Sequence, residues 1–282
     1  MTEKKYFVSY DSNVSITSLA QQILTDPDLP QLKSIRVGMW DADIYGIDPQ
    51  KIFDMIIENK EKFQHIEALY IGDMEQDENE VSWINQCCYE GLLAALPQLK
   101  SLTIKGSEGL SLGKVQHEKL EHLEIISGGL PREVVTALID GHLPSLTSLI
   151  LYMGVEDYGG TCEAADFEAL ANKDRFPKLK TLGFVNSEVQ DELVQVILSS
   201  NLLPQLETIM VSYGSLTDKG GQLILDAAGS LSHIKHLNAR YHYLSTEMME
   251  KLKALPFEVD VEEQEFPDEF DGEIYLYPMI TE

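Results

Sequence analysis

A short apolar phrase recurs along the chain with the pattern apolar–Pro–x–Leu–x–x–Leu–x–apolar. It reads LPQLKSIRV from Leu29, LPQLKSLTI from Leu96, LPSLTSLIL from Leu143, FPKLKTLGF from Phe176 and LPQLETIMV from Leu203. Looser copies without the proline begin at Phe63, Glu118 and Leu231, and a degenerate ninth copy begins at Leu255. Recurrence at this spacing is typical of repeat proteins. The copies share one Leu or Ile position, 21 to 34 residues apart: Leu32, Ile66, Leu99, Leu120, Leu146, Leu179, Leu206 and Ile234.

Each repeat predicts a strand followed by a helix. The phrase itself alternates apolar and polar residues, as a strand does, whereas the segments between phrases carry apolar residues at helical spacing. Three such stripes are Ile52, Phe53, Ile56 and Ile57; Val134, Val135, Leu138 and Ile139; and Leu193, Val194, Ile197 and Leu198. Asp48-Pro49 and the capping-box spacing of Ser187 and Gln190 predict helix starts.

Strand–helix units can close into a barrel or remain an open horseshoe, and the strand faces discriminate between these alternatives. A parallel barrel fills its interior with bulky branched side chains. Here the residues that alternate with the core positions are mostly small, hydroxylated or charged, for example Ser101, Thr103, Lys105, His122 and Glu124. Side chains of this kind cannot build a dry interior, so we expect an open sheet whose free face meets solvent or a partner. Ile150 is expected to be exposed there too.

With these phrases the chain resembles leucine-rich repeat proteins of the ribonuclease-inhibitor-like class over about residues 29–255. LTDKGGQLIL from Leu216 is similar to the turn-into-helix phrase of that class, whereas Asn186 alone occupies the position after a strand where the class usually has Asn. The resemblance implies an α/β solenoid, a horseshoe of about eight strand–helix repeats. Its parallel sheet would line the concave face and its helices the convex face.

A narrower likeness rests on segments outside the repeat phrase. They are GDMEQDENEVSWINQ from Gly72, SGGLP from Ser127, GVEDYGG from Gly154, SEVQDELV from Ser187 and YLYPMITE from Tyr275. In these segments the chain resembles a family of bacterial cytoplasmic leucine-rich repeat proteins that has no established activity. The likeness therefore implies an architecture and no chemistry.

We predict a single domain over residues 1–282, with caps at both ends of the stack, because a repeat buries its faces only against neighbours. Residues 1–28 form the first cap, with a strand in KYFVSY and a helix around Ile16–Leu24. Residues 256–282 form an acidic cap or tail, in which Glu258–Glu273 holds nine acids and no Lys or Arg. This stretch is either a solvated tail or a docking tail for a basic partner. The aromatic segment 275–277 suggests that the chain folds back afterwards.

The net charge of −26 disfavours nucleic acids and anionic membranes as partners. No apolar run approaches 18 residues, and the amino terminus has no apolar stretch behind its lysines, which predicts neither a membrane span nor a secretory signal. The three cysteines, Cys87, Cys88 and Cys162, have neither disulfide-framework nor zinc spacing. We therefore expect free thiols and a cytoplasmic location.

The motifs that could carry catalysis fail on context. Gly109–Gly113 (GLSLG) matches G-x-S-x-G, but only six residues follow before the next strand phrase, so no helix fits behind Ser111. Asp73–Asp77 lacks the glycine and the glutamate of a calcium loop. No Walker loop, G-x-G-x-x-G or H-E-x-x-H occurs. We expect no cofactor, no metal and no catalytic residue.

Two hypotheses for function remain open, with oligomeric stacking as a third. Loops 39–47, 73–80 and 153–160 concentrate acids beyond strand ends, whereas 24 inner-face positions carry one acid, Glu124. In the alternative hypothesis, an enzyme or an enzyme's accessory subunit has a small metal-dependent site under these loops. In the favoured one, a non-catalytic scaffold binds a basic protein on its concave face and acidic rim.

The favoured hypothesis names candidate partner-binding residues among the aromatic and charged side chains of the inner face and the strand ends. They are Arg36, Trp40, Tyr70, Glu124, Tyr152, Met210, Arg240 and Tyr241. Aromatic residues and arginine are enriched at protein interfaces. Further aromatic residues follow the strands at Tyr45, Tyr158, Tyr213 and Tyr243. For Trp40 and Tyr45, packing as anchors of their own loop remains an equal alternative.

Overall fold

One parallel sheet with its strands in chain order organises the molecule. The computed structural model describes residues 2–43 and 46–281. Within them the sheet has ten strands: β1 (Glu3–Tyr6), β2 (Ser34–Val37), β3 (Ala68–Ile71), β4 (Ser101–Lys105), β5 (His122–Ile126), β6 (Ser148–Gly154), β7 (Thr181–Ser187), β8 (Thr208–Met210), β9 (His236–Asn238) and β10 (Glu258–Asp260). In the described part β1 and β10 are its two edges, so the sheet stays open, as expected. The degenerate ninth phrase is confirmed as β10, whereas the first strand, β1, lies earlier than predicted and shares only Lys5 and Tyr6 with KYFVSY.

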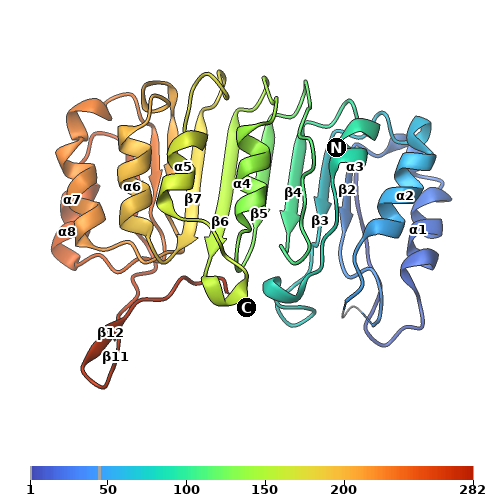
Figure 1. Cartoon of the computed structure of the whole chain (residues 1–282), viewed down its shortest axis with the longest axis horizontal. Coiled ribbons are helices and arrows are strands. Elements are labelled where there is room, and N and C mark those ends of the chain that lie inside the picture. Colours follow the sequence, from blue (N-terminus) through green and yellow to red (C-terminus); the bar gives the residue numbers. More distant parts are fainter. Residues whose placement is uncertain (1, 44–45, 282) are drawn as a thin grey trace.

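Helices connect successive strands and lie side by side as one layer along the sheet (Figure 1). They are α1 (Ile16–Leu24), α2 (Gln50–Glu58), α3 (Glu90–Ala95), α4 (Arg132–Ile139), α5 (Ala164–Leu170), α6 (Gln190–Ser199), α7 (Asp218–Asp226) and α8 (Thr246–Lys253). In the described residues no helix combines the length and the apolar character needed to cross a membrane. The alternation of strand and helix makes this a repeat-type α/β fold.

The connection between β4 and β5 is the exception, because it contains no helix. Leu110, Leu112 and Val115 from this loop are buried in the core in place of a helix. The exposed Ser111 therefore lacks the strand and helix that a nucleophile elbow requires, as its sequence context indicates.

The repeat phrase sets the core. All eight shared Leu and Ile positions are at most 3% exposed. Along the strands, residues that face the helices are buried and alternating residues are largely half-buried, which is the pattern expected of a sheet covered on one side. The aligned phrases also give the register: Ser34, Ala68, Ser101, His122, Ser148, Thr181, Thr208 and His236 are successive Cα partners.

Helix starts follow local hydrogen bonding, and one expectation about them is wrong. Thr217 caps α7 by accepting from the Lys219 N–H, within the LTDKGGQLIL phrase. The capping box of Ser187 and Gln190 is absent, because Val189 is the N-cap and Gln190 is the first helical residue. Its side-chain amide donates instead to the Phe184 carbonyl at 2.7 Å.

The acidic segment after α8 is more ordered than a solvated tail. Glu258–Asp260 form β10, and a hairpin of β11 (Asp268–Phe270) and β12 (Glu273–Tyr275) then projects away from the sheet (Figure 1). Residues 276–281, here called the return segment, run back across the carboxyl ends of the strands. The Met279 N–H donates to the Tyr213 carbonyl at 2.9 Å, which confirms that the chain folds back.

The two faces of β4 should respond oppositely to a buried charge. Leu102 is 1% exposed and faces the helices, so Leu102→Asp should destabilise the protein by about 4 kcal/mol or more. Thr103 is half-buried on the opposite face, and Thr103→Asp should cost no more than about 1 kcal/mol. Urea unfolding monitored by circular dichroism measures both. Equal losses of stability would contradict the assigned faces.

Candidate binding face

The strand register brings four candidate residues into one row on the face opposite the helices. Across β2 to β8 the row consists of successive Cα partners: Arg36, Tyr70, Thr103, Glu124, Ile150, Gly183 and Met210. Arg36 and Met210 are six strand positions apart, and at about 4.8 Å per position the row extends roughly 29 Å. Residues separated by 174 positions in the sequence thus line one continuous surface.

Arg36 and Tyr70 form an ordered pair on this row. The guanidinium lies over the Tyr70 ring at 5.0 Å from its centroid, a cation–π geometry. Arg36 Nε also donates to the carboxylate of Asp73 at 2.8 Å, and Lys5 Nζ lies 3.4 Å from the same carboxylate. Burial alone would raise the pKa of Asp73, but the hydrogen bond from Arg36 and the charge of Lys5 outweigh it and lower that pKa.

Lys105 attaches the next part of the acidic loop 73–80 to the sheet. Its Nζ donates to the Met74 carbonyl at 2.5 Å, and burial lowers the pKa of Lys105. Together with Lys5 and Arg36, three cations therefore hold the start of this loop. The loop's first acid, Asp73, is 6% exposed, and its negative charge faces the positive charges of Lys5 and Arg36.

The second half of the row is covered, contrary to expectation. Ile150 and Tyr152 are each 8% exposed, so both differ from the solvent-facing positions that the sequence predicts. They form a separate apolar cluster with Val185, against which Ile280 of the return segment packs. The physical reason is long-range: a segment more than 100 residues further along the chain covers this part of the face.

Aromatic rings continue this cluster along the carboxyl ends of the strands. The Tyr152 and Tyr213 centroids are 5.9 Å apart, and Tyr213 stacks on Tyr241 at 4.7 Å. Tyr213 and Tyr241, which follow β8 and β9, have φ of 64° and 55°, and Asn186, at the equivalent repeat position near the end of β7, has 57°. These residues thus adopt the left-handed backbone conformation at the same place in three repeats. Tyr241 is thus a half-buried member of a packed row.

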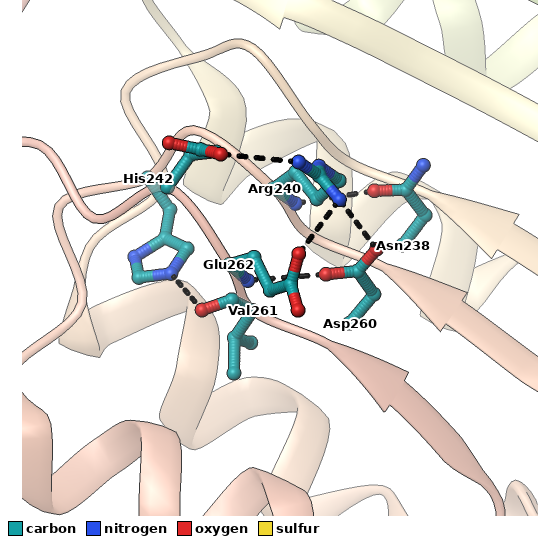
Figure 2. Close-up of polar contacts among 7 residues, drawn as sticks. Asn238, Arg240, His242, Asp260, Val261 and Glu262 are labelled. Carbon is teal, nitrogen blue, oxygen red and sulfur yellow. Dashed lines mark hydrogen bonds and ion pairs between the residues drawn. The ribbon is translucent and has the colours of Figure 1, made fainter.

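Arg240 is neutralised by the acidic segment. Figure 2 shows its guanidinium beside Asp260, which ends β10, and Glu262, with Nη1 2.9 Å from Glu262 and 3.5 Å from Asp260. Nη2 lies 3.3 Å from Glu263. Arg240 thus forms ion pairs with three carboxylates of its own chain, and the sequence did not predict these contacts.

Trp40 does not lie on the binding face. It is fully buried, and its indole N–H donates to the Ile47 carbonyl at 2.8 Å, so it anchors its own loop. The interpretation of Trp40 as a partner contact is therefore wrong, and the alternative of loop packing holds. Tyr45 lies outside the described residues.

Comparisons with known proteins find a close likeness among solved structures. No protein-family model matches the chain, and no curated protein matches it either. The crystal structure of a Bacteroides fragilis protein, a structural genomics target, is 46% identical with a TM-score of 0.88. The match covers 93% of this chain and 74% of that one. This chain belongs to the same family as that Bacteroides fragilis protein.

The acidic loops of this family member also have structural roles. In loop 39–47, Asp41 accepts from the Ile16 N–H at the start of α1 at 2.9 Å. Among the described residues no group of three or more His, Cys, Asp or Glu side chains is arranged to hold a metal ion. The three cysteines are free, with Cys87 buried, Cys162 half-buried and Cys88 exposed.

Sequence reasoning missed the groups that organise the face. Lys5 and Asp73 complete the contacts of Arg36, and Asn186 binds the return segment. A signal existed for Asn186, because it was the one Asn found in the usual place after a strand. Lys5 gave no comparable signal, since its partner lies 68 positions away and no pattern links the two.

The ion pair of Asp73 with Arg36 predicts that the stability of the protein depends on pH. Because the pKa of Asp73 is lower in the folded than in the unfolded chain, its stabilisation is complete above the unfolded value and is lost as pH falls through the folded value. Asp73→Asn should cost about 1–3 kcal/mol at neutral pH, and the difference from wild type should shrink towards pH 3. Asp77→Asn, exposed in the same loop, is the matched control. A difference that stays constant with pH would contradict the pairing.

The covered half of the row predicts a loss of stability where the open half tolerates change. Ile150→Asp places a charge in the cluster with Tyr152 and Val185 and should cost about 2–4 kcal/mol. Thr103→Asp, in the same row but on its open part, is the matched control. Urea unfolding of both variants checks the comparison, and tolerance of Ile150→Asp would show that this part of the face is open.

Proposed function

We propose that the chain is a leucine-rich repeat scaffold of the ribonuclease-inhibitor-like class that binds a partner protein on the open face of its sheet. The horseshoe form is part of this proposal. In-register strand–helix repeats support it, as does the left-handed backbone at Asn186, Tyr213 and Tyr241, which occupy the same position in three successive repeats.

The observation that carries the proposal is the exposure of one ordered sheet face. From β3 to β5 the alternating side chains of the strands are half-buried, and helices cover only the other side. Because the backbone hydrogen bonds of the sheet fix these positions, a partner meets a preformed surface. Little ordering entropy then opposes binding.

Arg36 and Tyr70 are the best placed anchors. Both are of residue types that dominate binding energy at protein interfaces, and their mutual stacking orders them in advance. Burial raises the pKa of Tyr70 to about 12, so its hydroxyl stays protonated at neutral pH and can donate a hydrogen bond. Glu124 lies two strands further along the same row as an acceptor.

Charge indicates the kind of partner. The chain carries a net charge of −26, and the edge of the sheet near β10 is flanked by Glu258–Glu273 with its nine acids. Such a field attracts a protein with a basic patch and accelerates encounter at low salt. We therefore expect association to slow as ionic strength rises.

A pull-down from native cell extract tests the proposal. The variant Tyr70→Ala with Thr103→Glu changes the centre of the open face, and it should lose the bound protein by at least about tenfold, as expected when an aromatic anchor is removed. The matched control, Tyr10→Ala with Thr17→Glu, makes the same changes at exposed positions off the sheet face. Mass spectrometry compares the proteins bound by the wild type, the variant and the control.

Circular dichroism must first show that all three proteins are folded. A protein retained by the wild type and the control but lost by the variant supports the proposal. If every bound protein is retained equally by the three, the open face is not the binding surface.

A further inference from the structure

The return segment lies in a groove that recognises its backbone. The Tyr243 hydroxyl is 3.0 Å from both the N–H and the carbonyl of Tyr277. The Asn186 amide accepts from the Ile280 N–H at 2.9 Å and donates to the Ile280 carbonyl at 2.5 Å. In addition, the Ser82 hydroxyl donates to the Thr281 carbonyl. Such contacts are independent of side-chain identity.

One side chain of the segment, that of the half-buried Ile280, packs on apolar residues of the sheet face, and this contact is here called the pocket. Ile280 packs against Ile150, Tyr152 and Val185, and the pocket is bordered by Ile126, Met210 and Tyr213. Counting the bond from the Met279 N–H to the Tyr213 carbonyl, the groove thus combines six hydrogen bonds to the segment's backbone with one pocket that suits a branched aliphatic residue. The segment adds no strand to the sheet edge, but the division of roles is that of extended-peptide recognition: hydrogen bonds to the main chain supply affinity and a side-chain contact supplies specificity.

Gly128 makes room for this arrangement. A Cβ at Gly128 would lie 2.5 Å from the Thr281 carbonyl oxygen, so any larger residue would push the segment out. Trp83, the residue after Ser82, is 55% exposed.

The hairpin of β11 and β12, which precedes the return segment, exposes apolar side chains. Phe266, Phe270 and Ile274 on and beside the hairpin are 73%, 69% and 71% exposed, and Tyr277 is 50% exposed. Phe270 pairs with Glu273 and Ile274 pairs with Glu269, so the two apolar side chains lie on opposite faces of the hairpin and both faces offer an apolar contact. Acids alternate with them, namely Asp268, Glu269, Asp271 and Glu273. A surface of this chemistry is complementary to a basic partner with apolar side chains.

We propose that this groove is the binding site for an extended segment of a basic partner protein, whose branched aliphatic side chain takes the pocket that Ile280 fills in the free protein. The return segment acts as an intramolecular occupant that the partner displaces while it docks on the hairpin. This proposal rests on the proposed function, because it specifies how the partner protein engages the covered half of the face.

To displace the return segment, the partner must compete with a segment of the same chain. A segment tethered by a short connection competes at an effective concentration on the order of millimolar. A partner segment must exceed that competition, and contacts with the exposed hairpin supply additional affinity. Weakening the return segment should therefore open the groove to a peptide supplied in solution.

The test uses the full chain carrying Ile280→Asp and the labelled peptide LYPMITE, which reproduces residues 276–282. By fluorescence anisotropy the variant should bind this peptide saturably, and the wild type at least about tenfold more weakly. The peptide LYPMDTE should not bind. The peptide LYPMITK should bind more tightly than LYPMITE at low salt, because the protein carries a net charge of −26. Absence of saturable binding, or equal binding of LYPMDTE, overturns the proposal, and equal binding of LYPMITK overturns the basic partner.

A conservative pair of variants checks the site. Adding Tyr243→Phe to Ile280→Asp removes the hydroxyl that contacts Tyr277, so peptide affinity should fall several-fold. The matched control is Tyr10→Phe, which removes an exposed hydroxyl near the other end of the chain. Equal affinity with and without the Tyr243 hydroxyl contradicts the groove assignment.

Hydrogen exchange on the wild type provides an independent test that does not depend on folding of Ile280→Asp. The amides of Met279 and Ile280 should exchange about a hundredfold faster than those of Leu149 and Leu182 in the sheet, because the segment opens locally. Exchange of all four at one rate overturns displacement. A concentration-dependent dimer abolished by Ile280→Asp would also overturn it, since the occupant would then be a second copy.

Failure of this inference can be distinguished from failure of the proposed function. If the peptide does not bind but the Tyr70→Ala, Thr103→Glu variant still loses its partner, only the groove is excluded. If no partner depends on the open face either, both proposals are wrong.

Discussion

The rest of the structure depends on the one-sided burial of its strands. The strands of the repeats, β2 to β9, each carry Leu or Ile that must be covered by helices, and each strand is too short to be stable except between neighbours in register. The register that aligns Leu102 with its neighbours Leu69 and Leu123 also aligns the residues between them on the other face. Packing of the core therefore creates the rows of side chains from which a binding face can be built.

Local periodicity made most of the fold predictable. The bounds of α1 coincide with the predicted segment Ile16–Leu24, and the missing helix between β4 and β5 follows from a repeat of only 21 residues. The register could be predicted because the phrases themselves were aligned. Each of these features is decided by residues that are close in the sequence, where alternation and turn chemistry act.

Burial by distant segments could not be predicted. Tyr152 and Arg240 occupy the predicted face, but the first is covered by the return segment and the second is surrounded by acids that follow β9. Trp40 is of a residue type that is common at interfaces, but it lies in the core, because its hydrogen bond to Ile47 closes a loop. Two clues did exist, namely the aliphatic side chains Ile150 and Val185 among small and polar neighbours.

The two halves of the face pose opposite physical problems. In the first half, Arg36 pairs with Asp73 and Lys105 donates to the Met74 carbonyl, so the charged groups beside the open sheet positions have partners and exposure costs little. In the second half, Ile150, Tyr152 and Val185 would be an apolar patch if left uncovered, and such a patch invites association. The return segment resolves this, and it is joined to the sheet by an acidic hairpin rather than by further core. A cover held mainly through backbone contacts protects the patch, and because those contacts are not specific to its own sequence, another extended chain with the right side chain can replace it.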